Sequence, residues 1–170
     1  AVAMTPSQVA ASEDLGSRTY ATIAGHVAAT YVETFTDDNG NGTQESFYDR
    51  ADVLYASLHV DPGAGWFPHY AGFADETGRG AGTGANLNVP LAPGSGDDLW
   101  LEALHRLVDS VAAHGTTALV VSLGVDAAAA DPESPLQVSH AAYEEGGRRL
   151  GALGLPTVAV QEGGYHLDTI

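Results

Sequence analysis

Short apolar runs separated by turn-forming residues dominate the pattern of hydrophobic and polar positions along the chain. Two of them, VLYASLHV and ALVVSL, are rich in β-branched or aromatic residues and too short for helices, so each predicts a buried strand. Segments with apolar residues at helical spacing alternate with these runs. This alternation predicts an α/β fold, a parallel sheet flanked by helices. The expected helices are 17–35, 42–50, 99–113 and 139–153, and the expected strands are 53–60, 87–91, 118–123 and 156–161, the last of them buried.

A long segment, residues 61–86, connects the first two strands and is rich in glycine and aromatic residues. Its aromatic side chains, among them Trp66 and Phe67, favour a folded loop that lines an apolar space rather than disorder. Its glycines include a spacing close to GxGxxG. Because no strand leads directly into that spacing and no helix opens from it, a dinucleotide site is a poor interpretation.

Two chemically capable side chains follow directly after expected strands. In open α/β sheets, functional residues gather just beyond the carboxyl ends of the strands. Asp126 follows the strand at 118–123, where it either binds a metal or a base, or caps the next turn. Tyr165 follows the strand at 156–161, where it either takes part in chemistry or packs after a Gly-Gly turn. The local sequence leaves both alternatives open.

The charge of the chain limits its partners. The 170 residues include 22 acidic and 6 basic ones, which gives a formal net charge of -16. Such a surface repels nucleic acid and anionic membranes and attracts a cationic substrate or a metal ion, although adaptation to salt or a coding bias against lysine explains it as well. The chain has no cysteine, no apolar run of membrane-spanning length and no signal-peptide pattern. A cytoplasmic location is therefore expected.

From Gly40 onward the sequence resembles the zinc-dependent histone deacetylase family, most closely its bacterial deacetylase-like members and acetylpolyamine amidohydrolases. The matching segments are GNGTQESFYDR, VLYASLH, the pair FP, GFADETGRGAGTGANLNVPL, SLGVDAAAADP and QEGGY. Each is weak alone, but together they occur in the family's order and at its spacing. The resemblance implies an arginase/deacetylase-like fold that is expected to be incomplete at both ends, with residues 1–39 as a divergent helical segment and 40–170 as a partial deacetylase-like domain.

The resemblance assigns roles to residues around the two strand ends. Asp126 matches the family's aspartate ligand of the catalytic Zn²⁺, and Asp131 matches a further acidic position in the same loop. Tyr165 matches the catalytic tyrosine, whose hydroxyl polarises the amide carbonyl and stabilises the oxyanion. The resemblance thus implies Zn²⁺ as cofactor and Tyr165 as a catalytic residue.

Further positions match the family's substrate tunnel and its structural cation site. Phe67 matches an aromatic wall of the tunnel that holds the acyl-amine, and Gly163 and Gly164 leave backbone space around the catalytic tyrosine. Ser57 and Leu58 match positions that help to bind a structural monovalent cation, such as K⁺.

The sequence departs from the family before Gly40. The family carries an Asp-x-His pair of zinc ligands there, whereas this chain has Thr36 and Asp38, followed by Asn39. Threonine is a poor zinc ligand, and Asp38 would give an oxygen-rich site. The Pro-Gly-His-His segment that supplies the family's general base is also absent from the sequence.

The expected function is zinc-dependent deacylation, the hydrolysis of the amide bond of acetylated lysine or of an acetylpolyamine. The expected partner is a small cationic acylated amine or an acetyl-lysine substrate, with no nucleic acid and no membrane. The alternative is a degenerate or truncated deacetylase-like protein that binds a ligand or partner without turnover. A third possibility is a structural fragment that needs a missing N-terminal portion to fold. The oligomeric state does not follow from the sequence.

Overall fold

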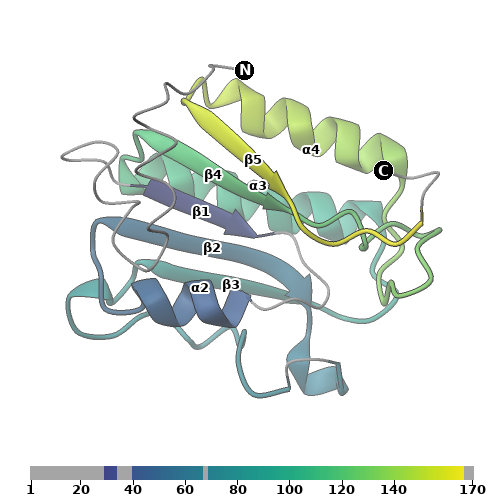
Figure 1. Cartoon of the computed structure of the whole chain (residues 1–170), viewed down its shortest axis with the longest axis horizontal. Coiled ribbons are helices and arrows are strands. Elements are labelled where there is room, and N and C mark those ends of the chain that lie inside the picture. The colour runs from purple at the N-terminus through teal and green to yellow at the C-terminus, as the bar shows by residue number, and fades with distance from the viewer. Residues whose placement is uncertain (1–28, 34–39, 67–68, 167–170) are drawn as a thin grey trace, which may run out of the picture.

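A parallel sheet organises the molecule (Figure 1). The computed structural model describes residues 29–33, 40–66 and 69–166. In this part of the chain the sheet has five strands in the order β3-β2-β1-β4-β5, and every pairing is parallel. The strands are β1 (Ala29–Glu33), β2 (Val53–Val60), β3 (Asn86–Leu91), β4 (Ala118–Leu123) and β5 (Thr157–Gln161). The α-helices are α2 (Gly40–Phe47), α3 (Asp97–His114) and α4 (His140–Ala152), with single 3-10 turns at Pro62–Ala64 and Gly80–Gly82.

The α/β prediction is confirmed, and β2 and β4 have the predicted bounds. The helix predicted over 17–35 is wrong at Ala29–Glu33, which forms the central strand β1. The rest of that range lies outside the described residues. Thr30, Tyr31 and Val32 are β-branched or aromatic and suit a strand, and hydrogen-bond ladders with β2 and β4 on both sides outweigh the helical spacing.

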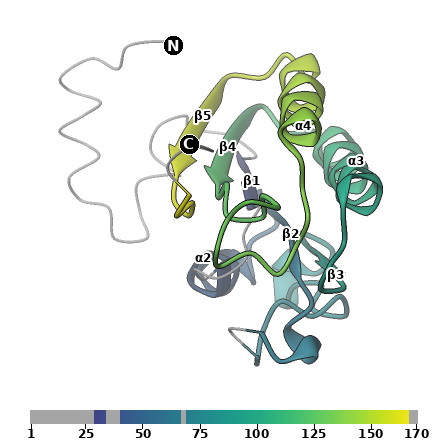
Figure 2. The same cartoon turned by 90° about the vertical axis from the view of Figure 1, so that its right-hand side faces the viewer.

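Helices cover the two faces of the sheet unequally. Figure 2 shows α3 and α4 side by side on one face and α2 on the other. The inward side chains of β2, β3 and β4 form a continuous apolar core with α3. Its largest fully buried members include Leu58, Leu104, Leu107 and Leu119. Burial of this apolar surface is the main favourable contribution to folding.

The starts of α3 and α4 are joined by one carboxylate. The N-cap of α3 is Gly96, with no side-chain hydrogen bond. The two Asp97 oxygens instead accept hydrogen bonds from Ser139 N at 2.7 Å and Ser139 Oγ at 2.6 Å. Ser139 is the N-cap of α4. Asp97 therefore fixes one helix start against the other, and these hydrogen bonds lower its pKa.

The edge strand β3 is covered by a polar network on the α2 face. Glu76 Oε2 accepts hydrogen bonds from Gly72 N at 2.7 Å, Phe73 N at 3.0 Å and Gln44 Nε2 at 3.0 Å. Gln44 Oε1 in turn accepts from Asn88 Nδ2 at 2.7 Å and from Asn86 Nδ2 at 3.2 Å. The long loop before β3 and helix α2 thus enclose this edge of the sheet through side-chain hydrogen bonds.

The opposite edge strand, β5, is exposed along its whole length, so its predicted burial is wrong. Val158 is 55% exposed and Val160 42% exposed. The apolar, β-branched sequence does form a strand, but no described segment covers either face of it completely. None of the described helices combines the length and the apolar character that crossing a membrane requires.

Candidate functional site

Two loops meet beyond the carboxyl ends of neighbouring strands. Because all the strands are parallel, these ends lie together at the right of Figure 1. The first loop runs from Gly124 to Ser139 after β4, and the second, Glu162–His166, follows β5. Backbone hydrogen bonds join them directly, from Glu162 N to Leu123 O at 3.0 Å and from Val125 N to Gly163 O at 3.1 Å. This edge is where open parallel sheets carry their functional residues.

Asp126 lies at the centre of the first loop and is completely buried. The backbone of Gly163 packs directly against its carboxylate, so that a Cβ at position 163 would overlap Asp126 Oδ2. Only glycine allows this approach of the two loops. The structure thus places Gly163 against the aspartate, and the space that it is predicted to leave around the tyrosine stays a prediction.

Tyr165 follows in the second loop, and its side chain is 49% exposed. Its backbone N–H donates a 2.7 Å hydrogen bond to Oδ2 of Asp131, and the next backbone N–H, of His166, donates to the same oxygen at 3.0 Å. The loops that carry Asp126 and Tyr165 are therefore joined, and Gly163 lies against Asp126. The contact made by Asp131 was not predicted.

A second contact that the sequence did not reveal lies where the two loops begin. The hydroxyl of Ser122, the buried penultimate residue of β4, donates a short hydrogen bond to Glu162 Oε1. Its only sequence signal is a polar residue in an otherwise apolar strand, beside an acid that directly follows the next strand. The bond reinforces the alignment of the two strand ends.

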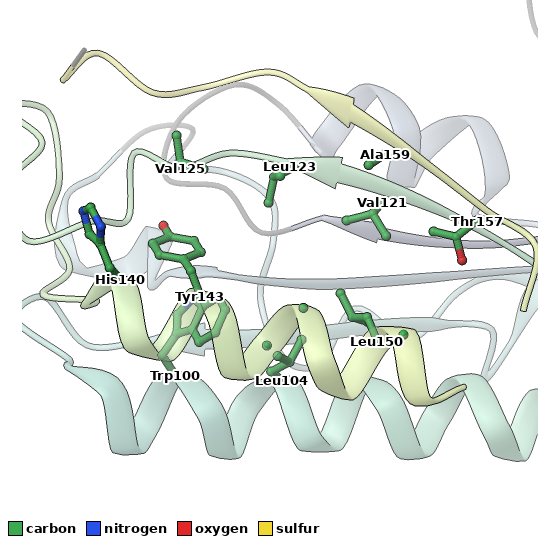
Figure 3. A pocket seen from close by; sticks show the side chains of 13 residues that line it. Trp100, Leu104, Val121, Leu123, Val125, His140, Tyr143, Leu150, Thr157 and Ala159 are labelled. Carbon is green, nitrogen blue, oxygen red and sulfur yellow. The ribbon is translucent and has the colours of Figure 1, made fainter. Parts of the chain in front are cut away.

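Helix α4 contributes Tyr143 to the surroundings of Asp126. Burial is the main cause that raises the pKa of Tyr143, and the charge of Asp126 adds to it. The ring packs on Trp100 with 5.2 Å between centroids. A pocket of about 450 Å³ lies between α4 and the strands β4 and β5. Figure 3 shows Tyr143 and His140 at one end of it. Its lining is mostly apolar, so it is suited to hydrocarbon rather than to charged groups.

The positions matched to the structural cation lie elsewhere, on β2. Ser57 is 2% exposed, and its hydroxyl lies 2.7 Å from His59 Nδ1, while His59 Nε2 lies 2.8 Å from the carbonyl oxygen of Gly72. A carbonyl only accepts, so Nε2 carries the proton and Nδ1 accepts from Ser57. Burial lowers the pKa of His59. Leu58 points into the apolar core, which leaves only its backbone carbonyl for a cation.

The fit of the site to Zn²⁺ is limited within the part of the chain that the structure describes. No group of three or more His, Cys, Asp or Glu side chains in those residues could hold a metal ion. Asp126 offers one buried carboxylate, whereas a zinc site needs at least three protein ligands. The described residues therefore do not supply a zinc site by themselves. Asp38 and Thr36, like the tunnel residue Phe67, lie outside the described residues.

Comparison with known proteins gives a consistent result. The histone deacetylase domain model matches residues 38–170. Acetylpolyamine amidohydrolase 1 of Pseudomonas aeruginosa is 48% identical over 132 residues, which are 78% of this chain and 38% of that protein. An acetylpolyamine amidohydrolase of Mycoplana ramosa is 47% identical over 132 residues, again 78% of this chain and 38% of that protein.

Solved structures extend the agreement to the fold. The crystal structure of acetylpolyamine aminohydrolase from Burkholderia pseudomallei superimposes with a TM-score of 0.83 at 41% identity, covering 88% of this chain and 43% of that one. The chain thus spans roughly two fifths of the length of these relatives. With the family model matching most of the sequence, the chain belongs to the histone deacetylase domain family.

Proposed function

We propose that the chain hydrolyses the amide bond of an acetylated amine, an acetylpolyamine or acetyl-lysine, with Zn²⁺ as cofactor. The observation that carries the proposal is that Asp126 and Tyr165 belong to two hydrogen-bonded loops at the carboxyl ends of β4 and β5. Membership of the family and relatives named acetylpolyamine amidohydrolase support the reaction class. The net charge of -16 supports a cationic amine as substrate.

In the proposed reaction, water adds to the acetyl carbonyl carbon and the C–N bond then breaks, which releases acetate and the free amine. Tyr165, which is half exposed, donates its hydroxyl hydrogen bond to the carbonyl oxygen as negative charge develops there. A bound Zn²⁺ would polarise the same carbonyl, with Asp126 as one ligand. Asp38 is the sequence-based candidate for a second ligand and lies outside the described residues.

The test is the turnover of an N-acetylated polyamine by the full chain supplied with Zn²⁺. Replacing Tyr165 by Phe removes the hydroxyl and keeps the ring, so we expect kcat to fall by roughly 10²–10³ with little change in KM. Tyr48→Phe, on the far side of the sheet, is the matched control and should keep full activity. Equal losses in kcat and in substrate affinity for Tyr165→Phe would contradict the assigned role.

A second candidate function is binding of an acylated amine without turnover. It is favoured by the finding that the described residues hold no group of three metal-ligating side chains. Saturable binding of an acetylated polyamine without release of the free amine, with and without added Zn²⁺, would establish this function and exclude the first. Release of the amine that stops when Zn²⁺ is removed would establish the first.

A further inference from the structure

A single carboxylate holds the backbone of the loop that carries Tyr165. Asp131 belongs to the loop after β4 and is 6% exposed. Its Oδ2 accepts from Tyr165 N at 2.7 Å and from His166 N at 3.0 Å. These are charge-assisted hydrogen bonds in a site from which water is largely excluded, so they are stronger than neutral ones.

Asp131 is itself fixed by its own loop. Its Oδ1 accepts a hydrogen bond from Glu133 N at 3.0 Å, and its backbone N–H donates to Ala128 O at 2.9 Å. Because the carboxylate is anchored on its own side, its position determines where the two N–H groups of the other loop lie. The position of the loop after β5 therefore depends on the loop after β4.

The second loop needs this anchor because of Gly164. The carbonyl of Gly163 is held by Val125 N at 3.1 Å, and the next residue, Gly164, has a φ of 133°. Glycine rotates freely in this region, so the Gly163 contact alone does not fix the direction in which the chain continues. The two bonds to Asp131 are donated by the two residues that directly follow Gly164.

We propose that Asp131 is the positioning residue for Tyr165, which orients the Tyr165 hydroxyl relative to Asp126 through the backbone N–H groups of Tyr165 and His166. Asp131 does not contact the substrate, and its effect on turnover passes entirely through Tyr165. This inference rests on the proposed function for its catalytic consequence, while the anchoring itself is independent of any reaction.

The catalytic consequence is tested by a double-mutant cycle in the full chain, with Asp131→Asn, Tyr165→Phe and the double variant. Asparagine keeps the shape but offers one acceptor oxygen where aspartate offers two. We expect Asp131→Asn to lower kcat roughly 10- to 100-fold with KM changed less than about twofold. In the Tyr165→Phe background the same change should have almost no effect. Equal losses in both backgrounds would overturn the proposal, because a general structural defect acts without Tyr165.

Glu133→Gln is the matched control in the same loop. Glu133 contributes its backbone N–H to the contact, and its side chain is exposed, so kcat and KM should stay at the wild-type values. Suppose that wild type and Glu133→Gln turn over substrate, and that Asp131→Asn lowers kcat equally in the wild-type and Tyr165→Phe backgrounds. The positioning role then fails while the proposed function stands.

Amide hydrogen exchange of the zinc-free chain tests the anchoring without any turnover. The amides of Tyr165 and His166 should be protected in the wild type and exchange at least about tenfold faster in Asp131→Asn, with the amides of β4 unchanged. Unprotected amides in the wild type would overturn the anchoring even if the variant did not fold. If the wild type shows protection but no turnover, the proposed function fails and the exchange of Asp131→Asn still decides the anchoring.

Discussion

The two edge strands of the described sheet, β3 and β5, differ in what covers them. In β3 every residue is buried or partly buried, and Asn88 is only 1% exposed, whereas in β5 every residue is exposed. The edge at β3 is enclosed by α2 and by the loop that carries Glu76. An apolar, β-branched run therefore predicts a strand, while the burial of that strand depends on segments far away in the sequence.

The covered edge is stabilised by specific contacts that one substitution can remove. On one face of the sheet, β2 and α3 pack in the apolar core. On the other face, Glu76 Oε2 accepts hydrogen bonds from four other residues, Gly72, Phe73, Gln44 and Asn88. The open edge offers few comparable contacts. Substitutions on the two edges should therefore differ widely in their effect on the free energy of unfolding.

The largest effect on stability is expected for Leu58→Ala in β2, the strand that pairs with the covered edge strand β3. Leu58 is 0% exposed and belongs to the apolar core, so its truncation leaves a cavity and should lower the free energy of unfolding by about 3–5 kcal/mol. Urea denaturation followed by circular dichroism measures the loss. A cost below about 1 kcal/mol would mean that this side of the sheet is loosely packed.

The next effect is expected for Glu76→Ala. Its removal deprives the N–H groups of Gly72 and Phe73 and the amide of Gln44 of an acceptor, which should cost about 2–3 kcal/mol. Asp75→Ala, at the exposed neighbouring position, is the control and should stay within about 0.5 kcal/mol of the wild type. Equal stability of the two variants would show that the network does not hold the loop.

A smaller effect concerns the contribution of His59 to the pH dependence of stability. The loop that carries Glu76 also covers His59, through Gly72. Burial places the pKa of folded His59 below the unfolded value of about 6.5. The unfolded chain therefore binds the proton first, so stability should be complete above about pH 6.5 and fall as the pH decreases toward the folded pKa. In His59→Gln this part of the pH dependence should disappear.

Urea midpoints of wild type and His59→Gln between about pH 7 and pH 5 provide that measurement. If His59→Gln retained the whole slope, the ring of His59 would have to be accessible to protons in the folded chain.

The smallest effect is expected on β5. Val158 is 55% exposed, so Val158→Thr should change the free energy of unfolding by less than about 0.5 kcal/mol. The same change at Val121 in β4, 5% exposed, buries a hydroxyl and should cost about 1–3 kcal/mol. Equal costs at the two positions would show that β5 is covered in solution and would remove the contrast between the edges.

Much of the fold followed from sequence patterns that have a local physical cause. The runs at β2 and β4 predicted both strands with their bounds, because a short apolar, β-branched run fits little else. The central strand at Ala29–Glu33 was missed because its apolar residues also fit a helical spacing, and only pairing with two distant strands decides between them. Local patterns carry no information about such pairing.

The site also combines features that local sequence predicts with features that depend on distant segments. Asp126 and Tyr165 could be predicted to lie near each other, because both follow strands of one parallel sheet. The anchoring by Asp131 and the contact of Gly163 with Asp126 could not, since they depend on how two loops fold against one another. The roles assigned to Asp38 and Phe67 stay predictions, as both residues lie outside the described part of the chain.

The most direct test of the proposed function is the release of free amine from an N-acetylated polyamine by the full chain with one equivalent of Zn²⁺, measured beside its Tyr165→Phe variant. We predict zinc-dependent release by the wild type and a rate lower by roughly 10²–10³ in the variant. A wild-type rate no higher than that of Tyr165→Phe, in a chain that is folded and supplied with Zn²⁺, would contradict the proposed deacetylase function.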